Sequence, residues 1–139
     1  MVDASVLVEL VLQTTRARAV HQAVGATDMV APDVVNLEVL STLRRLERTG
    51  KLPAQRANQA VDDLVDAYVR RFATLPLLPA AWKLRANVTA SAACYVALAR
   101  DLGCALVTVD PRLSRAPKLG VPLVTVERVR TTLPVTLRS

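Results

Sequence analysis

The chain has 139 residues, 52% of them hydrophobic, so it can bury a core without disulfide bonds, and we expect residues 1–139 to form one domain. Only 3% are aromatic, so the core must consist of Val, Leu and Ala. The net charge of +6 and the pI of about 10.1 suit a polyanionic partner such as nucleic acid. The mean hydropathy of +0.31 fits either apolar surface covered by a partner or an ordinary aliphatic core.

The residue content excludes several chemistries. His21 is the only histidine, which rules out a two-histidine ribonuclease mechanism and a Ser-His-Asp triad. Cys94 and Cys104 lie in apolar runs and indicate small buried thiols rather than zinc ligands. No apolar run approaches the roughly 20 residues that span a bilayer, and the first residues lack the basic region of a signal peptide, so we expect a cytoplasmic protein.

Short strands that alternate with helices are predicted along the chain, which favours a parallel sheet flanked by helices. The predicted strands are 2–5, 29–31, 105–109 and 121–126, with 75–79 as a strand or an extended linker. The predicted helices are 5–13 with Ser5 as its cap, 16–24, a long one from Pro32 to Gly50, one opened by Pro53 with Val65 and Tyr68 on its inner face, 80–86, and 89–102 capped by Thr89.

Three acids stand in or beside these apolar runs. Asp3 lies near the end of the first strand, and Asp110 follows the 105–109 strand. The carboxyl ends of parallel strands meet at one sheet edge, so both should lie there. Glu38 lies on the long helix, at the border of its apolar stripe. Carboxylates gathered in this way repel one another unless a cation joins them, and Mg²⁺ or Mn²⁺ suits an all-oxygen site.

Each acid also has a purely structural explanation, and these alternatives stay open. Asp3 suits a cap or a turn, Glu38 suits pairing with Arg45 or Thr42, and Asp110 suits a turn. An acid at position 92, three residues after Thr89, would complete a capping box. Their shared placement at one sheet edge favours the site.

Four short segments, spread over nearly the whole chain, stand in a distinctive order. They read Val-Asp-Ala-Ser-Val at 2–6, Leu-Glu-Val-Leu at 37–40 before Leu-Arg-Arg, Asn-Val-Thr-Ala at 87–90 before Tyr-Val-Ala-Leu-Ala, and Leu-Val-Thr-Val-Asp at 106–110. The set resembles the PIN-domain ribonucleases, specifically the VapC toxins of bacterial toxin–antitoxin pairs. The resemblance implies an α/β, PIN-like domain with a short central parallel sheet flanked by helices.

The resemblance also implies a function. One or two Mg²⁺ or Mn²⁺ ions would assist hydrolysis of RNA phosphodiesters, leaving a 5′-phosphate and a 3′-hydroxyl. A VapB-like antitoxin would inhibit the enzyme from an apolar groove, and the toxin would be a homodimer. The implied metal ligands are Asp3, Glu38, position 92 and Asp110, with Ser5 and Thr108 in support. Basic residues that could contact RNA phosphates are Arg44, Arg45, Arg48, Arg112, Arg115 and Lys118.

Position 92 departs from the family pattern, because Ala92 stands where the family has Asp. We therefore expect this chain to be impaired or inactive. Ala92 is either a natural degenerate change or a substitution that disarms the nuclease, and its well-matched surroundings favour the latter. Two alternatives stay open: a non-catalytic PIN-fold module that binds antitoxin or RNA, and a housekeeping PIN nuclease.

Overall fold

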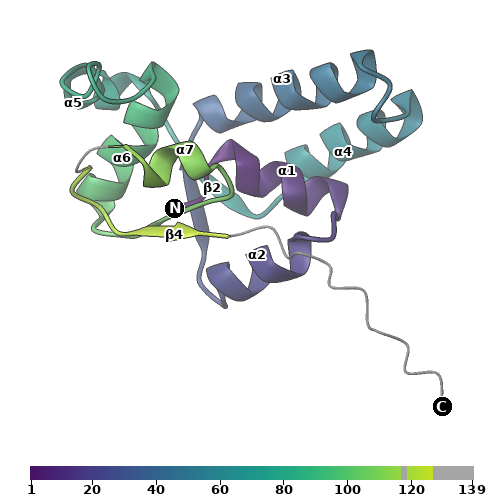
Figure 1. The fold of residues 1–139 in the computed structure, drawn as a ribbon, viewed down its shortest axis with the longest axis horizontal. Helices are drawn as coiled ribbons and strands as arrows, with labels where there is room; N and C mark the ends of the chain where they lie inside the picture. The colour runs from purple at the N-terminus through teal and green to yellow at the C-terminus, as the bar shows by residue number, and fades with distance from the viewer. Residues whose placement is uncertain (117–118, 127–139) are drawn as a thin grey trace.

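The computed structural model describes residues 1–116 and 119–126, so Lys118 lies outside the described residues. Two pairs of parallel strands lie near its centre (Figure 1). Strand β1 (Met29–Pro32) pairs with β2 (Val69–Phe72), and β3 (Leu106–Thr108) pairs with β4 (Leu123–Thr125).

The N-terminal residues link the two strand pairs. Val2 forms a parallel bridge with Val107 of β3, and its N–H donates to the carbonyl of Val30 in β1 at 3.0 Å. The Val107 N–H donates to the Met1 carbonyl at 2.8 Å, and the Asp3 N–H donates to the Val107 carbonyl at 3.3 Å. The first three residues therefore lie in the middle of the sheet, and Asp3 leaves it at a carboxyl end.

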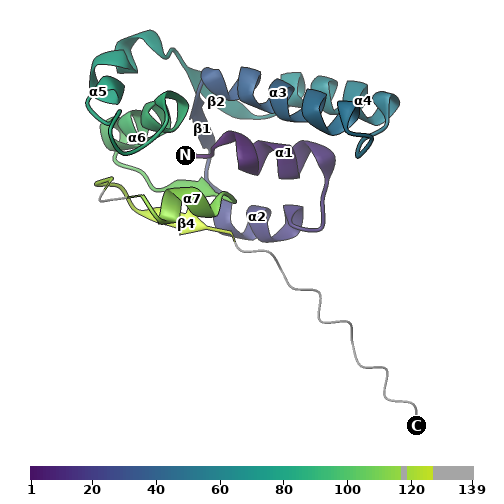
Figure 2. The same cartoon turned by 45° about the horizontal axis from the view of Figure 1, so that its top comes forward.

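Helices flank this sheet, which confirms the predicted α/β class. They are α1 (Ala4–Leu12), α2 (Ala17–Val24), α3 (Val34–Arg48), α4 (Ala54–Asp66), α5 (Leu78–Trp82), α6 (Ala90–Leu102) and α7 (Pro111–Ser114). Both views place α5 and α6 on one side of β1 and β2, and α1, α3 and α4 on the other (Figures 1 and 2). In Figure 2, α1 lies between the α3–α4 pair and α2.

The core is aliphatic, as the composition requires. Val6 and Leu7 of α1 and Val35 and Val39 of α3 are fully buried. Residues 93–99 of α6 are all buried, because this helix packs against α5, β1 and β3. Within the described residues, no helix combines the length and apolar character needed to cross a membrane.

Predictions about where individual elements begin were partly wrong. The expected strand at 2–5 is only the Val2 bridge, and Asp3 rather than Ser5 caps α1. Pro32 ends β1 instead of opening the long helix, which begins at Val34. The predicted helix cap at Thr89 and the helix that it begins are confirmed.

The segment 75–79 is neither a strand nor an extended linker. It forms a 3₁₀ turn, η1 (Leu75–Leu77), followed by the start of α5, which ends at Trp82 rather than at residue 86. Pro76 and Pro79 stand in the first turns of these short helices, where a missing N–H leaves no helical bond unmade.

Strand β2 and helix α7 were not predicted. Val69–Phe72 reads Val-Arg-Arg-Phe, which lacks the alternation of a half-buried strand, and α7 is only 4 residues long. Val65 and Tyr68 were expected to face inward but are 72% and 95% exposed. Tyr68 lies beyond α4, which ends at Asp66, whereas Val65 lies within α4 on its exposed side.

The packing of α1 predicts the effect of a truncation. Leu7→Ala should lower the free energy of unfolding by about 2–5 kcal/mol, because Leu7 is fully buried and a cavity remains. Leu37→Ala is the matched control, since Leu37 is 66% exposed, and should change stability by less than about 0.5 kcal/mol. Urea unfolding measures both, and equal losses would contradict the assigned position of α1.

Candidate active site

Asp3 is a buried carboxylate at the end of the N-terminal segment. It is 6% exposed, and its Oδ1 accepts the N–H of Val6 at 3.2 Å, so it caps α1. The hydroxyl of Ser5 donates to Oδ1 at 2.5 Å, and that of Thr108 donates to Oδ2 at 2.5 Å. The pKa of Asp3 is raised, chiefly by burial, although each of these three hydrogen bonds lowers it.

Ser5 and Thr108 also join Asp3 to the segment that follows β3. The Val109 N–H donates to the Ser5 hydroxyl at 2.9 Å, and the Asp110 N–H donates to the Thr108 hydroxyl at 3.0 Å. Each hydroxyl therefore accepts a backbone N–H and donates to Asp3. These hydrogen bonds fix where the backbone of Asp110 lies after the end of β3.

Glu38 reaches the same region from α3. Tyr95 of α6 is 2% exposed, and its hydroxyl donates to Glu38 Oε1 at 2.6 Å. The pKa of Glu38 is raised, chiefly by burial and further by the charge of Asp3, although the Tyr95 hydrogen bond lowers it. Burial and the neighbouring Glu38 in turn raise the pKa of Tyr95, so its hydroxyl stays protonated and remains a donor.

Position 92 lies in the first turn of α6, close to these groups. The Ala92 N–H donates to the hydroxyl of Thr89 at 3.3 Å, which is one half of a capping box. Ser91 precedes it, and Tyr95 follows three residues later on the same helix face. Because Tyr95 contacts Glu38 and lies one helical turn from position 92, a carboxylate at position 92 would lie near Glu38.

Asp110 is bound by a cation from its own chain. Arg112 Nε lies 3.0 Å from both Asp110 carboxylate oxygens, and its Nη2 lies 2.7 Å from Oδ2. Asp110 also caps α7 by accepting the Arg112 N–H at 2.9 Å. The pKa of Asp110 is lowered, chiefly by the Arg112 side chain. The Arg112 side chain is 85% exposed, so the pair can open to solvent.

The three acids are close enough to interact electrostatically but are not arranged as metal ligands. The charge of Asp110 raises the pKa of Asp3, and the charge of Asp3 raises that of Glu38. Within residues 1–116 and 119–126, no group of three or more His, Cys, Asp or Glu side chains is positioned to hold a metal ion. Both oxygens of Asp3 and of Asp110 already accept hydrogen bonds, and Ala92 offers no ligand. As arranged, the residues present do not fit the expected cation.

The basic residues separate into two groups. Arg112 and Arg115 belong to α7 and the residue after it, beside Asp110. Arg44, Arg45 and Arg48 lie at the carboxyl end of α3. Arg112 binds Asp110 in this structure, and its contact with RNA phosphate stays a prediction.

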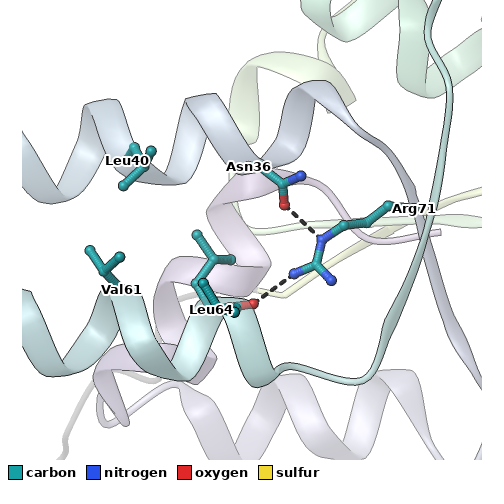
Figure 3. Close-up of a pocket in the computed structure, with 6 residues that line it drawn as sticks. Asn36, Leu40, Val61, Leu64 and Arg71 are labelled. Atoms are coloured by element: carbon teal, nitrogen blue, oxygen red, sulfur yellow. Dashed lines mark hydrogen bonds between the residues drawn. The ribbon is translucent and has the colours of Figure 1, made fainter.

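An apolar groove lies between α3 and α4 (Figure 3). Leu40 of α3 and Val61 and Leu64 of α4 line it, with Asn36 and Arg71 at one end. The Arg71 guanidinium donates to Asn36 Oδ1 and to the Leu64 carbonyl, both at 2.7 Å, and so ties the two helices together. Because these bonds occupy Arg71, the groove is apolar in its exposed lining.

Comparison of the sequence with known proteins assigns the chain to a family. The profile of the PIN domain matches residues 1–119. The chain belongs to the PIN domain family. It is 37% identical to Ribonuclease VapC9 of Mycobacterium tuberculosis over 128 residues, which cover 92% of this chain and 98% of that protein. It is 38% identical to Ribonuclease VapC3 of the same organism over 117 residues, covering 84% and 85%, and 31% identical to Ribonuclease VapC12 over 116 residues, covering 84% and 90%.

The resemblance to PIN-domain proteins of the VapC type is thereby confirmed. Sequence reasoning missed Tyr95, because a tyrosine in the apolar run of α6 gives no sign that its hydroxyl reaches Glu38 on another helix. It also missed the Asp110–Arg112 pair, although the spacing of two residues around Pro111 could have indicated it.

The raised pKa values predict how stability of this PIN domain depends on pH. Since burial raises the folded-state pKa of Asp3 and Glu38, their favourable contribution is fully present below the unfolded-state pKa and is lost as pH rises through the folded-state pKa. Glu38→Gln should therefore reduce the fall in stability between about pH 4 and pH 7. Asp110 acts in the opposite direction, since its pKa is lowered.

Urea unfolding across this pH range measures the effect. Glu47→Gln is the matched control, because Glu47 lies exposed on the same helix. If stability falls with pH equally steeply in Glu38→Gln and in Glu47→Gln, the raised folded-state pKa assigned to Glu38 is wrong.

Proposed function

We propose that this protein is the toxin of a VapBC-like pair and that its fold serves an endoribonuclease acting on cytoplasmic RNA. The observation that carries the proposal is the buried Asp3 carboxylate within electrostatic reach of both Glu38 and Asp110. Acids brought from α1, α3 and the end of β3 to one sheet edge suit phosphodiester hydrolysis. Membership of the PIN family and relatives named as VapC ribonucleases support it.

The cation that we propose for the intact family site is Mg²⁺ or Mn²⁺. Such an ion would polarise the phosphate and stabilise its developing charge. In this chain Ala92 withholds one carboxylate, and Arg112 already neutralises Asp110. We infer that the chain as it stands is impaired, and that a fourth carboxylate is needed for the acids to bind the cation.

The chain's own residues have separate roles in this proposal. Asp3, Glu38 and Asp110 are the catalytic acids. Ser5 and Thr108 orient Asp3 through their hydrogen bonds, and Tyr95 orients Glu38. Tyr95 is a positioning residue, because it acts through Glu38 and is itself buried.

The groove between α3 and α4 supports an inhibitory partner. A VapB-like antitoxin would place apolar side chains against Leu40, Val61 and Val65. The remaining exposed apolar side chains, which include Leu75 and Trp82, would suit a homodimer interface. We propose both associations for one PIN domain spanning residues 1–139.

A specific observation favours a second candidate, a non-catalytic PIN module that binds antitoxin or RNA. With Ala92 in place there is no fourth carboxylate, and Arg112 neutralises the charge of Asp110. The negative charge of the acids is therefore offset without an added cation. A housekeeping PIN nuclease is a third candidate. A small antitoxin gene directly upstream, whose product forms a complex with this chain, would favour the toxin over the housekeeping enzyme.

Ala92→Asp is predicted to produce an active, Mg²⁺- or Mn²⁺-dependent ribonuclease. The new carboxylate would lie in the first turn of α6 and beside Glu38, where it would complete the capping box with Thr89. Without metal, repulsion should leave stability flat or lower. Metal should then raise the melting temperature of the Asp form more than that of the Ala form, since binding to the folded state adds stability by mass action.

Ala90→Asp is the matched control, because it adds the same charge to the same helical turn at an exposed position. Thermal melts across a Mg²⁺ series and cleavage of RNA are measured on all three proteins. Equal metal stabilisation and equal cleavage in the Ala92→Asp and Ala90→Asp forms would show that position 92 is not the missing ligand.

A further inference from the structure

A basic hollow of about 230 Å³ lies at the carboxyl end of α3, and Arg44, Arg45, Arg48 and Thr49 line it. We propose that it binds a backbone phosphate of RNA, as a second contact remote from the acids. The proposal rests on the proposed function, because it assigns a substrate-holding site to the same enzyme.

The three arginines have no protein partner among the described residues. The ion pairs there join Arg16 to Glu9, Arg56 to Asp63 and Arg112 to Asp110, and no side-chain hydrogen bond involves Arg44, Arg45 or Arg48. Other arginines are occupied in other ways, either by carbonyls, as at Arg71 and Arg100, or by aromatic rings, as at Arg70 and Arg85.

Their spacing concentrates like charge on one surface of the helix. Arg44 and Arg48 are four residues apart, and Arg45 and Arg48 are three apart, so the side chains are neighbours and repel one another. An anion between them would remove that repulsion. Guanidinium groups present paired donors that match phosphate oxygens, which favours a phosphate over a simple halide ion.

Neutralisation of the helix end explains this cluster only in part. Arg45 and Arg48 lie in the last turn, where a cation is favourable, but Arg44 lies before it. The hydroxyl of Thr49 already donates to the Arg45 carbonyl at 2.9 Å, so the helix is capped without the arginine side chains. The guanidinium groups therefore remain available for a ligand.

The position relative to the acids favours RNA. Arg45 follows Glu38 by seven residues, which places it on the same face of α3 and about 10.5 Å further along the helix axis. A strand with one phosphate near Glu38 can therefore run along this face and place another phosphate in the hollow. A single strand offers phosphates at successive nucleotides, whereas a free anion would occupy the hollow alone.

The test measures binding of a short fluorescein-labelled single-stranded RNA by anisotropy, without divalent metal, over a series of salt concentrations. The variant R44Q/R45Q/R48Q should bind about tenfold more weakly near 0.1 M salt. Its plot of log affinity against log salt should be shallower by about 0.7 for each phosphate that the variant no longer neutralises. The control R18Q/K83Q/R85Q removes the same charge from exposed positions elsewhere and should change both quantities much less.

Further measurements identify the cause of any change. Circular dichroism melts establish that both variants fold, and R44K/R45K/R48K keeps the charge without the guanidinium donors and should bind with intermediate affinity. Equal losses in the glutamine variant and its control, or no loss in either, would overturn the site. The same variants are also tested with a fluorescein-labelled acidic peptide. If R44Q/R45Q/R48Q loses affinity for the peptide but keeps its affinity for RNA, the ligand is an acidic protein and not RNA.

The proposed nuclease is tested separately by cleavage with Ala92→Asp, in which the cluster is intact. Cleavage combined with cluster-independent RNA binding overturns the site and leaves the enzyme. Cluster-dependent binding without cleavage overturns the enzyme and leaves an RNA-binding face.

Discussion

The hydrogen bonds to the Asp3 carboxylate are the interaction on which the rest of the structure depends. A carboxylate in a nearly closed interior is costly unless donors replace its water, and here Ser5, Thr108 and the Val6 N–H do so. Those donors come from α1 and from β3, which are about a hundred residues apart in the chain. The acid therefore begins a helix, closes the centre of the sheet and fixes where Asp110 emerges. Fold and site share this interaction.

Repulsion between the acids is relieved differently at each one. Burial raises the pKa of Asp3 and of Glu38, which favours their protonated forms, while Tyr95 stabilises Glu38 by donating a hydrogen bond. Asp110 instead keeps its negative charge, because the guanidinium of Arg112 forms an ion pair with it. The same groups that would hold a metal thus reach a balance without one. A fourth carboxylate would disturb that balance, because it would add negative charge beside Glu38 without bringing a cation of its own.

Local sequence signals predicted those parts of the fold that local physics controls. The Thr89 cap and the stop at Gly103 follow from side-chain capping and from a left-handed backbone (φ 62°), and both could be read directly. Strand β2 could not, because Val-Arg-Arg-Phe becomes a strand only by pairing with β1. The acids could be predicted from apolar surroundings and sheet topology. Their environments could not, since Tyr95 reaches Glu38 across 57 positions of sequence.

The capping of α6 explains why its fold tolerates Ala92. Thr89 accepts the Ala92 N–H whether or not the side chain at position 92 is an acid, so the helix begins normally. The buried run of α6 that follows then packs against α5, β1 and β3, and Tyr95 still reaches Glu38. An acid at position 92 would add repulsion to a region where burial already disfavours charge. Stability therefore does not require a carboxylate there, and any need for one must come from a bound cation.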